Sequence, residues 1–206
     1  ADLKAGGLMV FHVVPTLDAA LKAIAAGVDG LIVEGGEGGG FKNPNDVASM
    51  VLLPLVRSKV DVPIIAAGGF IDGKTMAAAF ALGAEGIQMG TRMVSAAESP
   101  VHENWKNAIV DAKETGTVFL NKFHSPALRA LRTERTARLE RDPETNVMGQ
   151  FGTAQDLYFG GDMEAAIPLS GQVAGRIESV KPVAEILAET EAEFFETISS
   201  LARNYL

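Results

Sequence analysis

The sequence predicts an α/β fold in which short strands alternate with helices around a parallel sheet. Before residue 90 it contains four short, almost continuously apolar runs, which are typical of strands buried on both faces of such a sheet. The runs cover residues 8–14, 29–33, 62–67 and 85–89. The segments AAGVDGLIV and ALGAEGIQM repeat one order, in which Ala and Gly precede an acidic residue, a Gly and a strand. This self-similarity indicates serial βα units.

Four such strands fit either a doubly wound sheet or part of a (β/α)₈ barrel. A complete barrel takes about 250 residues, whereas this chain has 206. If the fold is a barrel, we therefore expect the chain to be its C-terminal portion, without the first strands. The start at Ala1, with no initiator Met, also leads us to expect a processed or truncated N-terminus.

Helices are predicted between these strands and in the second half of the chain. Thr16 can cap a helix that runs through Ala26, and Gly27 stands where a helix ends. Further helices are predicted over residues 44–57, 73–82, 100–114, 127–141 and 180–204, while 115–126 and 142–172 show no clear period. The helix over 127–141 is rich in Arg and Glu at i,i+4 spacing, which favours a solvated face over a phosphate or cofactor contact.

The composition argues against several functional classes. The formal net charge is -8 and Lys and Arg are scattered singly, so no surface is predicted to grip nucleic acid. No apolar run approaches the roughly 20 residues of a membrane span, and no signal peptide is recognisable. The sequence has no cysteine and three scattered histidines, which disfavours a metal site. We expect a soluble, cytoplasmic protein that binds a small-molecule substrate, and we also consider a homodimer.

Two glycine-containing loops follow successive predicted strands. AAGGFIDGK places Gly68 and Gly69 after the strand 62–67, and QMGTR places Gly90 and Thr91 after the strand 85–89. Each loop alone could simply turn the chain. Because the carboxyl ends of parallel strands meet at one edge, where free N–H groups can converge, the two loops together favour a phosphate site.

A third glycine-rich stretch, VEGGEGGGFKNP at residues 33–44, directly follows the apolar run that ends at Val33. It lacks the spacing of a dinucleotide fingerprint and the Gly-Lys-Ser/Thr of a nucleotide P-loop. One interpretation is a flexible connector. The interpretation we favour is a loop that lets a flat ligand lie against bare backbone.

Together these motifs resemble the flavin-dependent nitronate monooxygenases, also called 2-nitropropane dioxygenases, a family that includes the type II enoyl-acyl-carrier-protein reductases and related quinone reductases. The matching text is GVDGLIVEGGEGGGF, VPIIAAGGFIDGKTMAAAFALGAEGIQMGTRM and GQVAG. The resemblance implies an FMN-binding (β/α)₈ TIM barrel with a smaller, mainly helical inserted substrate domain. We accordingly expect barrel units over 1–99, the insertion over 100–172, and a C-terminal helix within 173–206 that packs back on the barrel.

The resemblance also implies roles for individual residues. It places the FMN phosphate on Gly68, Gly69, Gly90 and Thr91, with Gln88 and Met89 lining the same end, and it places Glu34, Gly35, Gly39 and Gly40 beside the flavin. In the family, the position of Phe41 is occupied by a catalytic His. A phenyl ring cannot accept a proton, so Phe41 suits a substrate pocket rather than acid–base work.

Other residues could contribute to the chemistry. His12 is the candidate catalytic base in place of the missing His, although a histidine satisfied by hydrogen bonds inside the barrel is the alternative. Lys42 could contact an anion in the substrate pocket or be solvated. His102 and His124 are expected at the surface.

Three functional hypotheses remain open from the sequence. The first is an FMN-dependent oxidoreductase, which either oxidises nitronates or nitroalkanes with O₂ or reduces quinone or enoyl substrates with NAD(P)H. The second is a non-flavin, phosphate-binding barrel isomerase or aldolase, for which Glu34 and Glu37 could be the carboxylate pair. The third is a non-catalytic remnant with open sheet edges.

Overall fold

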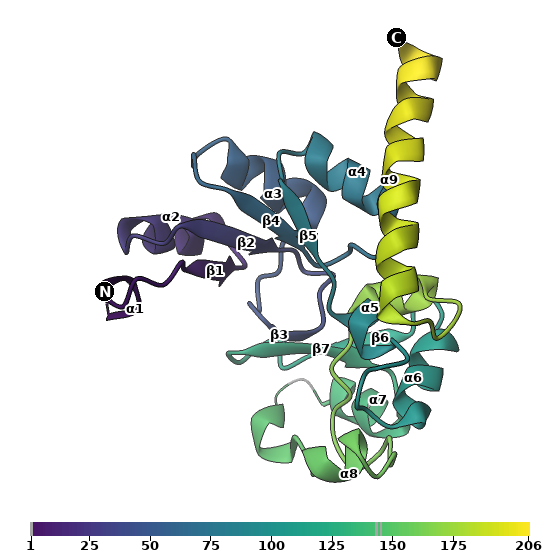
Figure 1. Ribbon diagram of the computed structural model, residues 1–206. Coiled ribbons are helices and arrows are strands. Elements are labelled where there is room, and N and C mark those ends of the chain that lie inside the picture. The colour runs from purple at the N-terminus through teal and green to yellow at the C-terminus, as the bar shows by residue number, and fades with distance from the viewer. Residues whose placement is uncertain (1, 143, 145) are drawn as a thin grey trace. The chain divides into compact units, whose positions relative to one another are not determined.

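The computed structural model describes residues 2–142, 144 and 146–206, and its chain divides into two compact units (Figure 1). Unit 1 comprises the described residues up to Gly36, together with Asp46–Met89 and Ala188–Leu206. Unit 2 comprises the described residues of Glu37–Asn45 and Gly90–Leu187. In each unit, some elements follow local sequence patterns, whereas others depend on strand pairing between segments that are distant in the sequence.

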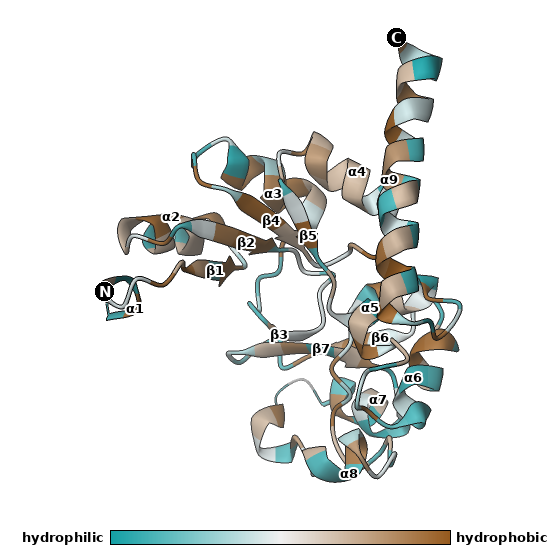
Figure 2. Ribbon diagram, in the orientation of Figure 1, coloured by the Kyte–Doolittle hydropathy of each residue, from teal (hydrophilic) through white to brown (hydrophobic). Residues whose placement is uncertain are grey.

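Unit 1 is a parallel α/β unit, and its four strands lie in the order β1-β2-β4-β5. In Figure 1, helices α2, α3 and α4 lie along this sheet, and Figure 2 shows that β1, β2 and β4 are largely hydrophobic. The predicted parallel α/β fold is confirmed. The elements are α1 (Asp2–Ala5), β1 (Phe11–Val14), α2 (Leu17–Ala25), β2 (Gly30–Glu34), α3 (Ser49–Arg57), β4 (Ile64–Ala67), α4 (Gly73–Ala81) and β5 (Gly86–Gln88).

The helices of unit 1 begin at polar caps. Thr16 Oγ1 accepts a hydrogen bond from the backbone N–H of Ala19 at 3.1 Å, as predicted for the start of α2. At α4, the Asp72 carboxylate accepts from Thr75 N at 2.8 Å, and the two residues form a capping box. These local bonds explain why helix starts could be predicted from the sequence.

One face of the unit 1 sheet packs on the helices. Because side chains alternate along a strand, cross-strand partners of equal register share a face. The buried residues of the helix-covered face include Val14, Leu31, Val33, Ile64 and Ala66. The intervening residues, such as Ile32 and Ile65, therefore project from the opposite face.

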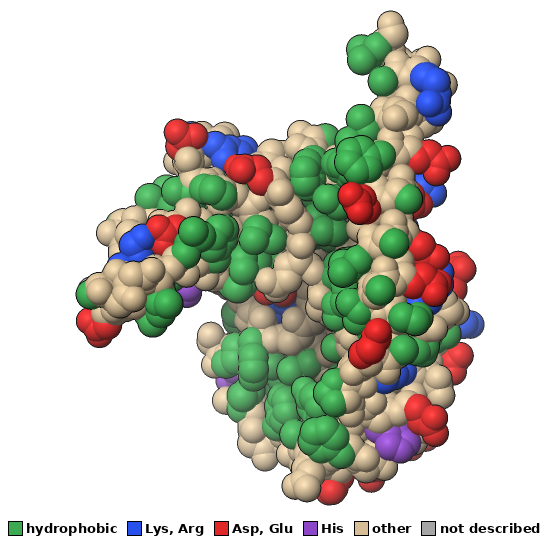
Figure 3. Space-filling model, viewed as in Figure 1, with side chains coloured by type: hydrophobic (Ala, Val, Ile, Leu, Met, Phe, Trp, Pro, Cys, Tyr) green, Lys and Arg blue, Asp and Glu red, His purple; other side chains and the backbone are tan. Residues whose placement is uncertain are grey.

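The C-terminal helix α9 (Val183–Tyr205) contributes its residues from Ala188 onward to unit 1. Phe194 packs edge-on against Phe80 of α4, with ring centroids 4.9 Å apart. The backbone N–H of Gly73 donates to Glu193 Oε2 at 2.9 Å. Figure 3 shows further hydrophobic side chains along α9. Phe195 of this helix is exposed.

Unit 2 holds a three-stranded antiparallel sheet in the order β3-β7-β6, surrounded by short helices. Its strands are β3 (Gly40–Lys42), β6 (Thr117–Leu120) and β7 (Ala127–Leu131). A buried cluster lies on one face of the sheet and includes Val118, Leu128 and Ile167. The helices are α5 (Thr91–Val94), α6 (Glu103–Val110), α7 (Glu134–Glu140), η1 (Val147–Gln150), α8 (Ala154–Tyr158), η2 (Gln172–Arg176) and the first residues of α9.

This sheet corrects the sequence analysis in three places. Residues 115–126 were expected to be irregular, but they contain β6. Residues 127–141 were expected to be one Arg-rich helix, but they contain the fully buried strand β7 followed by α7. The predicted helix over 44–57 begins only at Ser49, and β3 precedes it. The i,i+4 charges gave a helical pattern, whereas burial between two partner strands selected the extended conformation.

The unit boundaries also differ from the expected divisions after residues 99 and 172. Glu37–Asn45 belongs to unit 2 because β3 pairs with β7. Unit 2 begins at Gly90 because the following residues bond within it: Arg92 Nη1, for example, donates to the carbonyl of Ser179 at 2.9 Å. It extends to Leu187. These pairings join segments far apart in sequence, so the boundaries between the units could not be located from a change in the local sequence pattern.

Candidate functional site

The carboxyl ends of the strands in unit 1 bring several predicted site residues to one edge of the sheet. Glu34 of β2 is level with Ala67 of β4, and Ala67 is level with Gln88 of β5. All three project from the face opposite the helices, because their neighbours Val33 and Ala66 are buried on the covered face. The predicted convergence of the β2, β4 and β5 ends is therefore present in this unit.

The loop after β4 starts with two glycines in left-handed backbone. The φ angles of Gly68 and Gly69 are 77° and 93°. The loop that follows β2 is bonded to the end of β4, since Gly35 N–H donates to the Ala67 carbonyl at 3.0 Å. A side chain at Gly68 or Gly69 would strain the backbone. The turn by itself thus explains both glycines.

Gly90 differs from these two glycines. It follows Met89 after the end of β5 and has a φ of -91°, which any residue can adopt. An ideal Cβ at Gly90 would have no described atom within 4 Å. Neither backbone conformation nor packing among the described residues requires a glycine at this position. Close approach of a ligand is a physical reason that would still require one.

Thr91, the first residue of α5, is buried, with 7% of its surface exposed. Its Oγ1 accepts a hydrogen bond from Gly171 N at 2.8 Å. The hydroxyl proton of Thr91 can still be donated, because a hydroxyl both accepts and donates. Gly171 opens the GQVAG segment that supported the family resemblance, so two separate motifs meet within unit 2.

The glycines of the VEGGEGGGF stretch are partly explained by backbone packing. A Cβ at Gly39 would lie 2.5 Å from the carbonyl carbon of Ser170 and 2.6 Å from Gly171 N. Beside this contact, Gln172 N–H donates to the Glu37 carbonyl at 2.9 Å. Bare backbone at Gly39 is therefore needed for a close approach to residues 170–171. The sequence contained no signal for this partner segment.

Phe41 and Lys42 project from opposite faces of β3. Phe41 is 56% exposed, whereas Lys42 is only 6% exposed and has an interaction partner. The solvated alternative for Lys42 was therefore wrong. Gly40 is level with Arg129 of β7, so Lys42 and Arg129 share one face of the sheet. Arg129 is 7% exposed and lies over the Phe119 ring, 4.9 Å from its centroid.

His12 does not reach the carboxyl edge of the unit 1 sheet. It is the second residue of β1 and is level with Leu31, three residues before Glu34. Leu31 is buried on the helix-covered face, so His12 projects toward that same side. Its imidazole is exposed. The expectation that His12 stands at the strand end, in place of the family His, does not fit this register.

The other two histidines have structural contacts in unit 2. His102 caps helix α6, and its Nδ1 accepts from Asn104 N at 3.1 Å. His124 Nε2 lies 2.7 Å from the Glu144 carbonyl. Glu34 and Glu37, the carboxylate pair considered for an isomerase, belong to different units.

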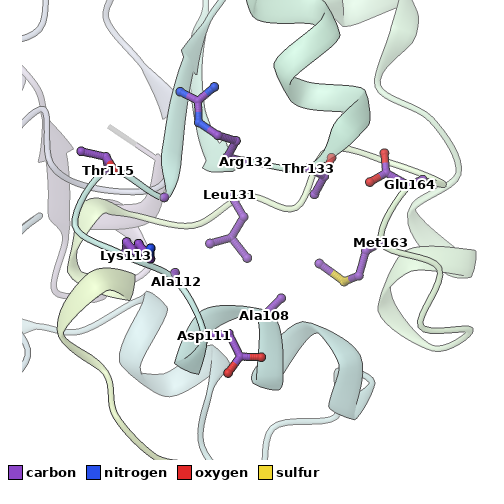
Figure 4. A pocket seen from close by; sticks show the side chains of 11 residues that line it. Ala108, Asp111, Ala112, Lys113, Thr115, Leu131, Arg132, Thr133, Met163 and Glu164 are labelled. Atoms are coloured by element: carbon purple, nitrogen blue, oxygen red, sulfur yellow. The ribbon is translucent and has the colours of Figure 1, made fainter.

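A cavity of about 680 Å³ lies in unit 2, between α6 and the start of α7 (Figure 4). In Figure 4 Leu131 lies in the middle of the lining side chains, with Ala108 of α6 and Asp111, which follows that helix, on one side and Met163 on another. Arg132 at its rim is paired with Glu140 Oε2 at 2.8 Å. No site residue proposed from the sequence lines this cavity.

Within residues 2–142, 144 and 146–206, no helix has both the length and the apolar character needed to cross a bilayer. Nor do three or more His, Asp or Glu side chains gather there in a way that could hold a metal ion.

Comparison with known proteins gives a consistent result. The family model described as nitronate monooxygenase matches residues 1–193. The (3aS,4S,5R,7aS)-5-hydroxy-7a-methyl-1-oxo-octahydro-1H-indene-4-carboxyl-CoA dehydrogenase of Rhodococcus jostii is 41% identical over 140 residues, which are 68% of this chain and 39% of that protein. A nitronate monooxygenase of Paraburkholderia phytofirmans is 30% identical over 217 residues, covering 98% of this chain and 58% of that protein.

Solved structures support the same conclusion. FabK from Thermotoga maritima has a TM-score of 0.93 and 39% identity, covering 100% of this chain and 66% of its own. Nitroalkane oxidase from Streptomyces ansochromogenes has a TM-score of 0.80 and 26% identity, with 97% and 61% covered. The predicted fold is confirmed: the chain corresponds to the C-terminal portion of a (β/α)₈ barrel protein. It spans only 39% to 58% of the length of the two curated relatives.

Proposed function

Because the chain belongs to the nitronate monooxygenase family, we propose that it is the part of an FMN-dependent oxidoreductase that holds the flavin phosphate. The observation that carries this proposal is the common register of Glu34, Ala67 and Gln88, which sets the ends of three parallel strands at one edge. In barrel enzymes, such carboxyl ends and their loops carry the active site.

Four residues that follow the ends of β4 and β5 would hold the phosphate: Gly68, Gly69, Gly90 and Thr91. The fit rests on the free space at the Cβ position of Gly90 and on the hydroxyl of Thr91, which retains a proton to donate. Gln88 is exposed at the end of β5 and would line the flavin together with Met89, Glu34, Gly35, Gly39 and Gly40. When bound, FMN supplies hydride, single-electron and O₂ chemistry.

For the substrate, we propose an anionic nitronate that is oxidised with O₂. Phe41 can accept no proton, so a substrate that arrives already deprotonated suits this chain better than a neutral nitroalkane.

A second candidate is NAD(P)H-dependent reduction of a quinone or enoyl substrate. Phe41 also favours this function, because a hydride or electron acceptor needs no base at that position to remove a proton from carbon. The two candidates share the flavin site and differ in the electron donor and acceptor.

The test of the common proposal is the absorption spectrum of the full-length protein. Bound flavin would give bands near about 370 and 450 nm, and heat release of the cofactor followed by chromatography would distinguish FMN from FAD. A purified, folded protein that shows no such bands even after incubation with FMN would contradict the flavin assignment. Steady-state rates with a nitronate and O₂, compared with NADH or NADPH and a quinone, would then separate the two candidates.

A further inference from the structure

A second cavity in unit 2 lies beside helix α7 and has a volume of about 480 Å³. Its lining residues are Arg135, Arg138, Leu139, Asp142 and Gln150. Arg135 and Arg138 are three residues apart on the helix, so their side chains leave the same side of α7 on successive turns. The cavity is therefore lined by two arginines from one side of this helix.

The guanidinium of Arg135 is held in place without a carboxylate. Its Nη2 donates to the Gln150 carbonyl at 2.5 Å, and its Nη1 contacts the Glu164 carbonyl at 3.4 Å. Its Nε is buried and has no hydrogen-bond acceptor among the described residues. The charge of Arg135 is thus oriented by backbone carbonyls but not neutralised by them.

Arg138 adds a second positive charge. Within the described ranges 2–142, 144 and 146–206, neither Arg138 nor Arg135 forms an ion pair with an acidic side chain. Asp142 is the acidic residue of the lining, and it takes part in an interaction of its own. The lining therefore carries two positive side chains and one negative side chain.

The larger cavity of Figure 4 has a different electrostatic character. Its Arg132 is paired with Glu140, and the carboxylate of Glu164 accepts hydrogen bonds from Glu134 N at 3.0 Å and Arg135 N at 2.6 Å. Its remaining charged lining residues, Asp111 and Lys113, have opposite signs. Of these two cavities, the one beside α7 has two arginines that form no ion pair within the described residues.

We propose that the cavity beside α7 binds a phosphate group carried by a larger ligand. Guanidinium groups bind phosphate oxygens through charge-assisted hydrogen bonds and match their geometry better than any other side chain. The volume exceeds that of a bare phosphate and falls within the usual range of small-molecule sites. The phosphate could belong to an adenine nucleotide or to a pantetheine carrier, and both sources offer the same chemistry to the two arginines.

Isothermal titration calorimetry of the full-length protein tests this site without any turnover, so its outcome does not depend on the proposed flavin chemistry. The probes are inorganic phosphate, adenosine 3′,5′-bisphosphate and 4′-phosphopantetheine. We expect at least one of the two organic probes to bind with a dissociation constant of about 1 mM or tighter. The tighter of the two identifies the nucleotide or the pantetheine as the source.

Two charge-removing variants on the same helix make the test specific. Arg138→Gln should weaken binding of the preferred probe by about 10-fold or more, because one charge-assisted contact is lost. Arg141→Gln removes an equal charge three residues further on, outside the cavity lining, and should change the dissociation constant by less than about 2-fold. Equal weakening of probe binding by both variants would overturn the proposal. So would the absence of binding to the wild type at a probe concentration of about 10 mM, which is 10-fold above the expected dissociation constant.

Discussion

Oγ1 of Thr91 accepts a hydrogen bond from the backbone N–H of Gly171 at 2.8 Å, in a buried part of unit 2. The bond joins the QMGTR loop to the GQVAG segment, which lies eighty residues further along the chain. It fixes the threonine hydroxyl and leaves its proton available for donation. The same hydroxyl can therefore both stabilise unit 2 and contribute to the proposed phosphate site.

Replacing Thr91 by valine should lower both stability and flavin retention. The variant leaves the buried N–H of Gly171 without its acceptor, which costs about 1–3 kcal/mol of unfolding free energy. Thr91→Ser keeps the hydroxyl and should retain most of both properties. Urea denaturation and the ratio of flavin to protein after purification measure the two effects. If Thr91→Val retains wild-type flavin content, Thr91 does not contact the cofactor.

Gly90→Ala and Gly69→Ala should separate ligand contact from backbone strain. At Gly90 the φ angle is negative and the Cβ has space, so alanine should leave the unfolding free energy unchanged or raise it by about 0.4–1 kcal/mol. Its FMN content should nevertheless fall. At Gly69 the φ of 93° makes alanine cost about 1–2 kcal/mol, whether or not flavin binds there. Full FMN occupancy in Gly90→Ala would remove Gly90 from the site.

Gly73→Ala should destabilise the protein, although it lies at the first position of a helix. Intrinsic propensity favours alanine over glycine by up to about 1 kcal/mol. Here, however, a Cβ would lie 2.5 Å from the carbonyl carbon of Glu193 and 2.6 Å from the Thr190 carbonyl oxygen. We expect a net loss of about 1–3 kcal/mol as α9 is displaced from α4. Gly149→Ala, where a Cβ would meet no described atom within 4 Å, is the control. A stabilising Gly73→Ala would contradict this packing.

Asp29 should make the protein less stable in acid. Its pKa is lowered below the usual value by the side chain of Lys4 and by the backbone N–H of Val10, which donates to Oδ2 at 2.7 Å. A carboxylate with a lowered pKa contributes stability above its unfolded pKa of about 3.9, and this contribution is lost as the pH falls through the folded pKa. In Asp29→Asn, unfolding free energy measured between about pH 5 and pH 2 should therefore fall less steeply. Asp18→Asn, at an exposed carboxylate, is the control; identical slopes for Asp29→Asn and wild type would exclude the effect.

Phe41→His should raise activity on neutral nitroalkanes relative to preformed nitronates. A positioned base typically contributes about 10²- to 10⁴-fold to proton removal, and Phe41 offers none. His12→Ala should have little effect, since His12 lies on the helix-covered face of the sheet. The measurement is the ratio of kcat/KM for a nitroalkane and its nitronate in the wild type and both variants. Efficient wild-type use of the neutral form that His12→Ala abolishes would instead assign the base to His12.

The candidate site illustrates how far sequence reasoning extends. The ends of β2, β4 and β5 could be aligned from the apolar runs alone, because parallel strands place successive loops at one edge. The face of His12 could not be predicted, because it depends on the register between β1 and β2. Burial of Lys42 likewise depends on a strand pairing between β3 and β7, whose sequences lie more than eighty residues apart.

The sequence by itself determined unit 1: apolar runs of strand length, Thr16 as a helix cap, and repeated glycines were enough to predict the order of its strands and the helices between them. These signals are local, since each acts through hydrogen bonds or side-chain alternation within a few residues. Tertiary structure alone decided the sheet β3-β7-β6, the strand conformation of Ala127–Leu131 and the backbone contact that requires Gly39. In each of these cases the deciding energy is burial or hydrogen bonding against a distant segment, which outweighs the local preference of the residues themselves.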